Sequence, residues 1–485
     1  MDAMSQQKSA PEIHRVLGTR DLILLNVVAI VGLRWIARAA QIGPSSLILW
    51  LLGFICFFVP LACSVLELSS RLPGEGGLYI WAKAAMGDFH GFVAGWTYWI
   101  ANLVFFPSLL LFSSGIFLYI GGADWLGWSE NSGYNGIYGM TVMWAATGLN
   151  IIGLHRVKWL QNIGGICTWS AAVVLVLAGA YSWSRFGAAT TVTSANLLPD
   201  FSKLATFTSF ATIAMAYTGL ELGPMIGGEM KDPRRQVPLA TLVSGLVVAF
   251  IYIAGTGSIF VALPAATIDA ISGIPQALNA VGERIGFPYF ARLTALLVTV
   301  GTVGAISANI TCTARLPYVV GADRYLPVIL SRLHPRYGTP HFALIIQGLF
   351  ISLVLMAALS GSTIHEAFNI LIDMTVILSL LPLLYIFIAL PVLRFRAGPV
   401  DAGVTRVPGG NVICIVIALT GFATTFLAIV TSMVPEQGNA NVTLFLVKVV
   451  GGSMLLIGVG LLFYWRGQQK MAAATAAHPV GNPVS

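Results

Sequence analysis

The chain has 485 residues, of which 57% are hydrophobic and 9% are charged, and its formal net charge is +7. A soluble protein carries about 25% charged residues, so this composition indicates an integral membrane protein. The five cysteines lie in apolar runs and the seven histidines have no metal-ligand spacing. We therefore expect no disulfide framework, metal centre, cofactor or enzymatic activity.

Hydropathy divides the chain into a polar start, a long series of apolar runs and a polar end. Residues 1–20 have no cleavable leader pattern and are expected to be a cytoplasmic tail. Twelve apolar runs are long enough to span a bilayer. They are expected near 21–40, 44–70, 88–120, 136–154, 158–183, 204–229, 237–262, 288–320, 340–360, 366–392, 411–434 and 441–465.

The connections between these runs predict the orientation. Of the 26 Lys and Arg residues, 19 fall in connections on one side, and such connections are usually cytoplasmic. Both termini are therefore expected in the cytoplasm, in a multi-pass protein of the cell inner membrane. Because this accounts for most of the positive charge, we expect membrane lipid and a small molecule as partners, not nucleic acid.

Two further segments have distinct compositions. Residues 263–287 are too polar and too interrupted to span, and are expected to form an extracellular loop with one or two short helices, a candidate lid. Residues 466–485 are rich in Ala, Gly and Pro and are expected to be a disordered cytoplasmic tail.

The sixth run contains the most informative sequence, from Phe210 to Pro238. Its apolar pattern is interrupted at Tyr217-Thr218-Gly219, and Glu221 follows two residues later. A charge at the centre of a spanning helix costs roughly 2.5–3.5 kcal/mol, so its usual explanation is functional. Unwound backbone at that depth is tolerated where it lines a cavity. The alternative is that Glu221 packs against an arginine for structural reasons.

The first run offers a matching interruption. Gly32 is followed by Arg34 and Arg38, which lie on one face if the segment is helical. Arg38 is close enough to the outer surface to extend its charge into water. Arg34 is deeper and needs an anionic or carbonyl partner, for which Glu221 and the carboxylate of a substrate are both candidates.

Three stretches carry a resemblance to a known family. They are AYTGLELGPMIGGEMKDPRRQVPLAT (Gly219, Glu221, Glu229, Pro233, Pro238), RLPGEGGLYIWAKAAMGDFHGFVAGWTYWIAN (Pro73, Gly74, Gly76, Gly77, Gly91, Gly95, Trp96, Trp99) and TARLPYVVGADRYLPVILSRLHPRYGTP (Arg315, Asp323, Pro327, Gly338, Thr339, Pro340). Over most of residues 18–395 the chain resembles the amino acid–polyamine–organocation superfamily of transporters. The three motifs occur in the order that the family has.

The resemblance implies an all-α integral membrane protein with a five-plus-five inverted repeat, in which helices 1 and 6 are broken. The transporter core would cover 21–392, with repeats at about 21–183 and 204–392, and helices 11 and 12 (411–465) would serve packing or a homodimer contact. In the amino-acid antiporters of this family, a Glu at the position of Glu221 helps gate passage. Asn102 matches a substrate-contacting Asn, although an interhelical hydrogen bond explains it equally well.

The chain also departs from the family pattern. A G-S-G type motif is usual at the helix 1 break, but here the residues are Gly32-Leu33-Arg34. Some proton-coupled relatives have a Lys near the position of Thr168, and an aromatic is expected near Asn309. These differences put in doubt both the usual carboxylate-binding mode and a Lys-based proton switch.

These arguments predict a secondary transporter that moves a small amino acid or derivative by alternating access, with a non-transporting amino-acid sensor as the alternative. The substrate-binding residues we expect are Val31, Gly32, Leu33, Arg34, Asn102, Tyr217, Thr218, Gly219 and Glu221. Glu221 and Arg34 are also candidates for gating or proton coupling. Tyr217 and Trp35 could close over the substrate or simply pack.

The coupling ion is open at the level of the sequence. Ser307 and Thr311 lie one helical turn apart and could bind sodium with carbonyls of the first run, or could join helices by hydrogen bonds. Proton coupling through Glu221 and uncoupled exchange are the other possibilities. The charge of the substrate depends on whether Arg34 pairs with Glu221: a free Arg34 favours an acidic or otherwise anionic substrate, and a paired one favours a neutral substrate.

Overall fold

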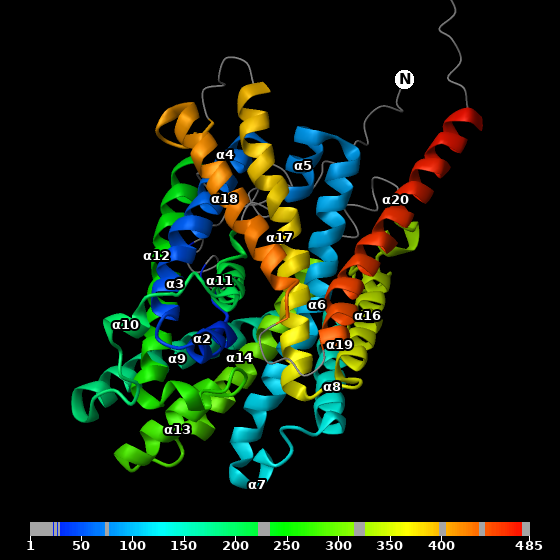
Figure 1. Cartoon of the computed structure of the whole chain (residues 1–485). Helices are drawn as coiled ribbons and strands as arrows, with labels where there is room; N and C mark the ends of the chain where they lie inside the picture. The colour runs from blue at the N-terminus through cyan, green and yellow to red at the C-terminus, as the bar shows by residue number, and fades with distance from the viewer. Residues whose placement is uncertain are drawn as a thin grey trace, which may run out of the picture.

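The computed structural model describes residues 23, 27, 30–72, 77–221, 233–314, 325–396, 404–435 and 442–477. Within these residues every regular element is a helix, as the composition predicts. The helices follow one another as a bundle of mostly long rods (Figure 1).

The first half of the described chain contains helices α2 to α10. Their bounds are α2 (Leu33–Ile42), α3 (Ser46–Gly53), η1 (Phe54–Phe58), α4 (Val59–Arg71), α5 (Leu78–Met86), α6 (Asp88–Gly121), α7 (Ala123–Leu126), α8 (Ser132–Ile152), α9 (Leu154–Phe186) and α10 (Ser194–Leu197). The segment α3–η1–α4 is one continuous rod, which we expected at 44–70.

The second half contains helices α11 to α20. Their bounds are α11 (Leu204–Ala216), α12 (Pro233–Ala262), η3 (Ala265–Thr267), α13 (Gly273–Ile285), α14 (Phe290–Thr313), η4 (Val328–Ser331), α16 (His341–Leu359), α17 (Ile364–Arg396), α18 (Gly410–Ser432), α19 (Val442–Leu446), η5 (Val447–Gly451) and α20 (Gly452–Ala477).

By length and apolar composition, nine helices in the described ranges can cross a membrane. The sequence predicts twelve spans. The other three would be α8, α2 together with the residues before it, and α11 together with the residues after it. The short helix α5 was not expected as a separate element.

Two long helices, α6 and α17, pack against each other through the middle of the bundle (Figure 1). Helix α14 packs against α9 and α6, and α18 packs against α17 and α11. Side chains along α6 are buried over most of its length because neighbouring helices surround it. This arrangement gives the molecule an interior in which a polar site can be kept apart from lipid.

The helical backbone ends at Ala216, in the middle of the apolar run that we expected at 204–229. Tyr217 forms a turn, and Gly219 has φ of +117°. That region of backbone space favours glycine, because other residues place a Cβ against the chain. Similarly, α2 begins at Leu33 after two non-helical residues, Val31 and Gly32. The chain thus has non-helical backbone at both positions that the sequence marked.

The segment 263–287 contains η3 and α13, in agreement with the one or two short helices expected there. Helix α13 packs against α2, α9, α12 and α14. In Figure 1 it lies at the end of the bundle to which α7 also belongs. We call residues 263–287 the lid segment.

A buried ion cluster lies at the end of the bundle opposite to the lid segment. The Glu67 carboxylate on α4 accepts hydrogen bonds from Arg71 Nη2 at 2.7 Å and from Arg394 Nη1 of α17 at 3.2 Å. The backbone N–H of Val407 donates to the same carboxylate at 2.8 Å. One carboxylate therefore serves both arginines, and the cluster connects α4, α17 and the segment before α18.

The C-terminal region differs from the expectation. Helix α20 continues to Ala477, so the tail expected to be disordered from 466 is helical for its first residues. The sequence between Arg466 and Ala477 contains five alanines, and alanine has the highest helix propensity.

Some of the sequence-based expectations fall on residues outside the described ranges. These are the N-terminal tail and the motif residues Pro73, Gly74, Gly76, Glu229, Arg315 and Asp323.

Candidate substrate site

A cavity of about 130 Å³ lies where α2, α6, α9, α11, α14 and α17 meet. A cavity on the order of 150 Å³ holds a molecule the size of benzene, so this space suits a small ligand. Its lining includes eight of the nine substrate-binding residues expected from the sequence: Val31, Gly32, Leu33, Arg34, Asn102, Thr218, Gly219 and Glu221. Residues distant in sequence are thus brought to one place.

Arg34 is the cationic group of this cavity. Its side chain comes from the first turn of α2 and is 3% exposed. The guanidinium carbon lies 4.2 Å from the centre of the Trp35 ring and 4.0 Å from that of Phe105. Its buried Nε has no hydrogen-bond partner, and among the described residues no carboxylate forms an ion pair with it. Stacking on two aromatic rings stabilises the cation but leaves the Nε–H donor unused.

Glu221 is the anionic group, and it is held by its own segment and by α6. Its Oε2 accepts a hydrogen bond from the Gly219 backbone N–H at 2.9 Å, and its Oε1 accepts one from the Tyr98 hydroxyl at 3.3 Å. The residue is 2% exposed. The positive φ of Gly219 turns the chain that follows, so that the Glu221 carboxylate lies within hydrogen-bond distance of the Gly219 N–H.

The cavity therefore holds one buried positive and one buried negative group that are not paired with each other. In the part of the chain that the structure describes, neither residue belongs to a salt bridge. A charge removed from water without a partner is costly, and this cost favours a ligand that supplies the missing partner.

Tyr252 on α12 connects the two non-helical segments and is not among the residues predicted from the sequence. Its hydroxyl lies 2.8 Å from the carbonyl oxygen of Ile30 and 3.0 Å from that of Ala216, and it accepts a hydrogen bond from the Gly32 N–H at 3.1 Å. The hydroxyl has one proton, which is shared between these two carbonyl oxygens or donated to one of them. Nothing in the local sequence around Tyr252 distinguishes it from other tyrosines in apolar helices.

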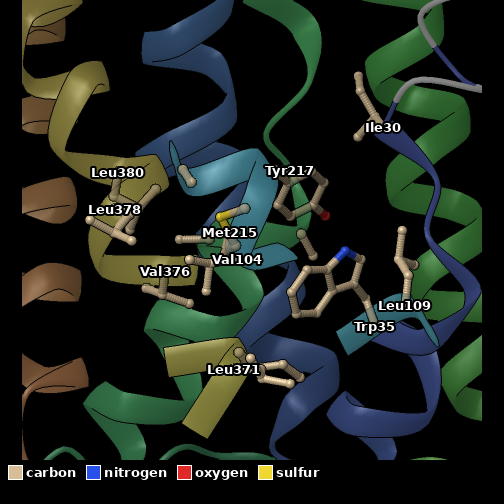
Figure 2. Packing of buried hydrophobic residues seen from close by; sticks show 14 of the residues in the cluster. Ile30, Trp35, Val104, Leu109, Met215, Tyr217, Leu371, Val376, Leu378 and Leu380 are labelled. Carbon is tan, nitrogen blue, oxygen red and sulfur yellow. The ribbon is translucent and has the colours of Figure 1, made fainter. Parts of the chain in front are cut away.

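Tyr217 does not line the cavity, although it was expected among the substrate-binding residues. Its hydroxyl donates to the carbonyl oxygen of Trp50 at 3.0 Å, and its ring packs edge-on against Trp50 and Tyr252. Trp35, by contrast, lines the cavity and covers Gly32. Figure 2 shows Trp35 and Tyr217 within the packed interior near Met215. The structure thus favours packing for Tyr217 and contact with the cavity for Trp35.

Polar side chains from three other helices complete the lining. Asn102 Nδ2 donates to the Tyr98 carbonyl at 2.8 Å, within α6. Thr168 of α9 and Asn309 of α14, two of the positions at which the chain departs from the family pattern, also line the cavity. The hydroxyl of Thr168 donates to the Gly164 carbonyl at 3.0 Å. The departures therefore lie at the candidate site.

Ser307 and Thr311, the candidate sodium ligands, lie away from this lining and are engaged in hydrogen bonds between helices. Ser307 Oγ accepts from Asn150 Nδ2 at 3.1 Å, and the Thr311 hydroxyl donates to Asn150 Oδ1. Thr311 Oγ1 also accepts from Gln161 Nε2 at 3.1 Å. These bonds join α14 to α8 and α9.

A model of the amino acid permease family matches residues 17–459. The chain belongs to this family. The superfamily inferred from the three motifs is thereby confirmed.

Relatives of this amino acid permease cover nearly its whole length. An uncharacterized transporter of Legionella pneumophila is 27% identical over 95% of this chain and 98% of its own. A probable agmatine/putrescine antiporter of Lactococcus lactis is 23% identical over 94% and 96%. A glutamate/serine transporter of Bacillus subtilis is 26% identical over 95% and 83%.

These findings describe a multi-pass membrane protein of amino-acid transporter type. They give no support to the alternative of a non-transporting sensor. The named substrates of the relatives include cations, an anion and a neutral amino acid. Family membership therefore does not determine the charge of the substrate, which has to be inferred from the site.

Proposed function

We propose that this permease is a secondary transporter that carries a small zwitterionic amino acid by alternating access, with Arg34 binding the substrate carboxylate. The observation that carries the proposal is a fully buried guanidinium that faces the cavity without a carboxylate partner among the described residues.

The carboxylate assignment follows from the chemistry of arginine. A guanidinium presents parallel N–H donors that match the two oxygens of a carboxylate. Arg34 also lies in the first turn of α2, where backbone N–H groups have no intrahelical acceptor and the helix dipole favours negative charge. In the family, backbone N–H groups at this break hold the carboxylate. Here Arg34 adds a charged side chain to them.

The ammonium assignment follows from Glu221, which lines the same cavity. Its carboxylate accepts two hydrogen bonds from uncharged donors and retains lone pairs for a third. A zwitterion provides one partner for Arg34 and one for Glu221, and it leaves no net charge in the cavity. An acidic substrate would bring a second carboxylate for which the described lining has no second cation.

We further propose that the architecture follows the family: twelve spans, a five-plus-five inverted repeat (about 21–183 and 204–392) and broken helices 1 and 6. The two interruptions at Gly32 and Gly219 then form the substrate site, and both termini face the cytoplasm. The hydrogen bonds of Tyr252 to both interruptions support this proposal, because they couple the two segments that must move together.

As the group that couples transport to an ion, Glu221 is better supported than the proposed sodium ligands Ser307 and Thr311. Both hydroxyls are already engaged with Asn150, and neither faces the cavity. We therefore propose proton-coupled or exchange transport, in which Glu221 changes its partner between the two ends of the cycle.

The test is uptake of a labelled amino-acid panel by proteoliposomes that contain the wild type, Arg34→Ala or Glu221→Gln. Each is measured with a sodium gradient, with a proton gradient, and with unlabelled amino acid inside. We expect uptake by the wild type and strong loss in both variants. Normal uptake in both variants would contradict the proposed site, and strict dependence on sodium would contradict the proposed coupling.

A further inference from the structure

His365 lies between two carboxylates at the lid end of the bundle. Its Nε2 is 2.5 Å from Asp269 Oδ2 in the lid segment, and its Nδ1 is 2.9 Å from Glu130 Oε1 in the connection between α7 and α8. His365 itself is near the start of α17. Three separate parts of the chain therefore meet at one imidazole, which we call the His365 clasp (His365, Asp269 and Glu130).

The geometry depends on the protonation of the ring. A neutral imidazole carries a proton on only one nitrogen, whereas both carboxylates can only accept hydrogen bonds while they are ionised. Both contacts are satisfied together only by the imidazolium. Loss of one proton therefore removes one of the two hydrogen bonds and the attraction between the charges.

Asp269 also shapes the lid segment itself. Its Oδ1 accepts hydrogen bonds from the Ser272 N–H at 2.6 Å, the Ser272 hydroxyl at 2.7 Å and the Ile271 N–H at 3.0 Å. Burial by itself raises the pKa of Asp269, but the hydrogen bonds from His365 and Ser272 outweigh it and lower the pKa to about 2. The Asp269 carboxylate thus stays ionised over the pH range in which an imidazole ordinarily titrates.

Other charged or titratable groups of the described chain lie on the elements around the clasp. Glu366, the next residue of α17, accepts a hydrogen bond from the Thr363 N–H at 3.0 Å. Lys448 of η5 donates to the carbonyls of Ser360 at 2.7 Å and Ala358 at 3.3 Å. Tyr119 of α6 lies beside Ser272 and Asp269. Among these groups, His365 is the one whose ordinary titration range is near neutral pH.

The lid segment rests directly on the helix that carries Arg34. Gly273, the first residue of α13, is so close to α2 that an added Cβ would lie 3.2 Å from the Ala37 Cβ. Ile271 is closer still to α6, because a Cβ added at Gly115 would lie 2.6 Å from the Ile271 Cγ2. Holding the lid segment in place therefore also restrains α2, one turn away from Arg34.

We propose that the His365 clasp is a pH-dependent latch, which fastens the lid segment over α2 when the imidazole is protonated and releases it when the proton leaves. The protonated imidazole is stabilised in the fastened state, so the latch stabilises that state at pH values at which His365 is protonated. This stabilisation is lost as the pH rises and the proton leaves. The latch makes opening of the lid end easier at alkaline pH. The inference goes beyond the proposed function, since it concerns access to the cavity and not the choice of substrate.

The test is amide hydrogen exchange of peptides from residues 263–287 in the purified full-length protein, without substrate, at about pH 6 and about pH 9. Exchange times are scaled for the intrinsic dependence of the rate on pH. We expect about tenfold faster exchange at the higher pH in the wild type, as one charge-assisted hydrogen bond is lost. His365→Gln should exchange fast at both values, and His365→Arg, which keeps a cation, should be slow at both.

Glu366→Gln is the matched control, because it removes a carboxylate one residue away that does not contact the imidazole, and it should behave as the wild type. Equal scaled exchange of the wild type at the two pH values would overturn the latch. So would a His365→Gln protein that retains the wild-type dependence on pH. Since the measurement uses no substrate, its result is independent of whether an amino acid is transported.

Discussion

The strongest consequence of the site concerns Arg34→Met, which removes the guanidinium and keeps most of the side-chain volume. In the absence of substrate, the guanidinium is buried without a carboxylate partner among the described residues. Its replacement should therefore not destabilise the empty protein, since exchanging buried charge for an apolar side chain of similar volume is often neutral or stabilising. The substrate, in contrast, should lose its partner.

The magnitude follows from the expected bond. A hydrogen bond to a charged group contributes about 1.5–3 kcal/mol, and each 1.4 kcal/mol is a factor of ten in affinity. Arg34→Met should therefore weaken binding of the substrate by about ten- to a hundredfold. Arg34→Lys should recover only part of the loss, because an ammonium cannot form the parallel pair of bonds that a guanidinium forms.

Two assays separate these effects: the unfolding temperature without substrate, and the shift of that temperature on adding an amino acid that the wild type binds. We expect an unchanged or higher temperature without substrate and a greatly reduced shift with it. A variant that unfolds at a much lower temperature without substrate would refute the reasoning, because Arg34 would then be a structural cation. A variant with an unchanged shift would refute the role in binding.

Other variants test neighbouring parts of the account. Glu221→Gln should lower the affinity for amino acids by about tenfold and leave the affinity for the same carboxylic acid without its amino group unchanged, measured by competition. Tyr252→Phe should lower the free energy of unfolding by about 1–3 kcal/mol, measured by denaturation in detergent, because it removes the hydroxyl that joins both interruptions. Arg394→Met should cost about 1.5–3 kcal/mol in the same assay, since it removes a charged hydrogen bond to Glu67 while Arg71 remains; an effect as small as that of Arg34→Met would contradict the distinction between the two arginines.

Much of the fold could be predicted from hydropathy alone. Apolar runs of spanning length gave helices such as α6 (Asp88–Gly121) and α17 (Ile364–Arg396) to within a few residues, because only helices satisfy the backbone inside a bilayer. The interruption after Ala216 was predictable for a related reason, since Gly219 and a nearby carboxylate are unfavourable in an uninterrupted span.

The charged residues of the site could be predicted from the sequence, but the positions of its tyrosines, which depend on packing, could not. Arg34 and Glu221 stand out because each is a charge in an apolar run. Tyr217 and Tyr252 look alike in sequence, yet the first packs against Trp50 and the second joins the two interruptions. Only the three-dimensional arrangement separates two such tyrosines.

The His365 clasp shows a similar limit. Asp269 and Glu130 lie 96 and 235 residues from His365, and no local pattern links them. The sequence identified the lid segment as too polar to span, but the contact that fastens it joins Asp269, in the turn before α13, to the start of α17.

The most direct test of the central claim, that Arg34 binds the substrate carboxylate, is a double cycle of variant and ligand. Binding of an amino acid and of its carboxamide, in which the carboxylate is replaced by a neutral amide, is measured to the wild type and to Arg34→Met. The account predicts that the wild type prefers the amino acid by about tenfold or more and that the variant does not distinguish the two ligands. An equal preference in both proteins would contradict it.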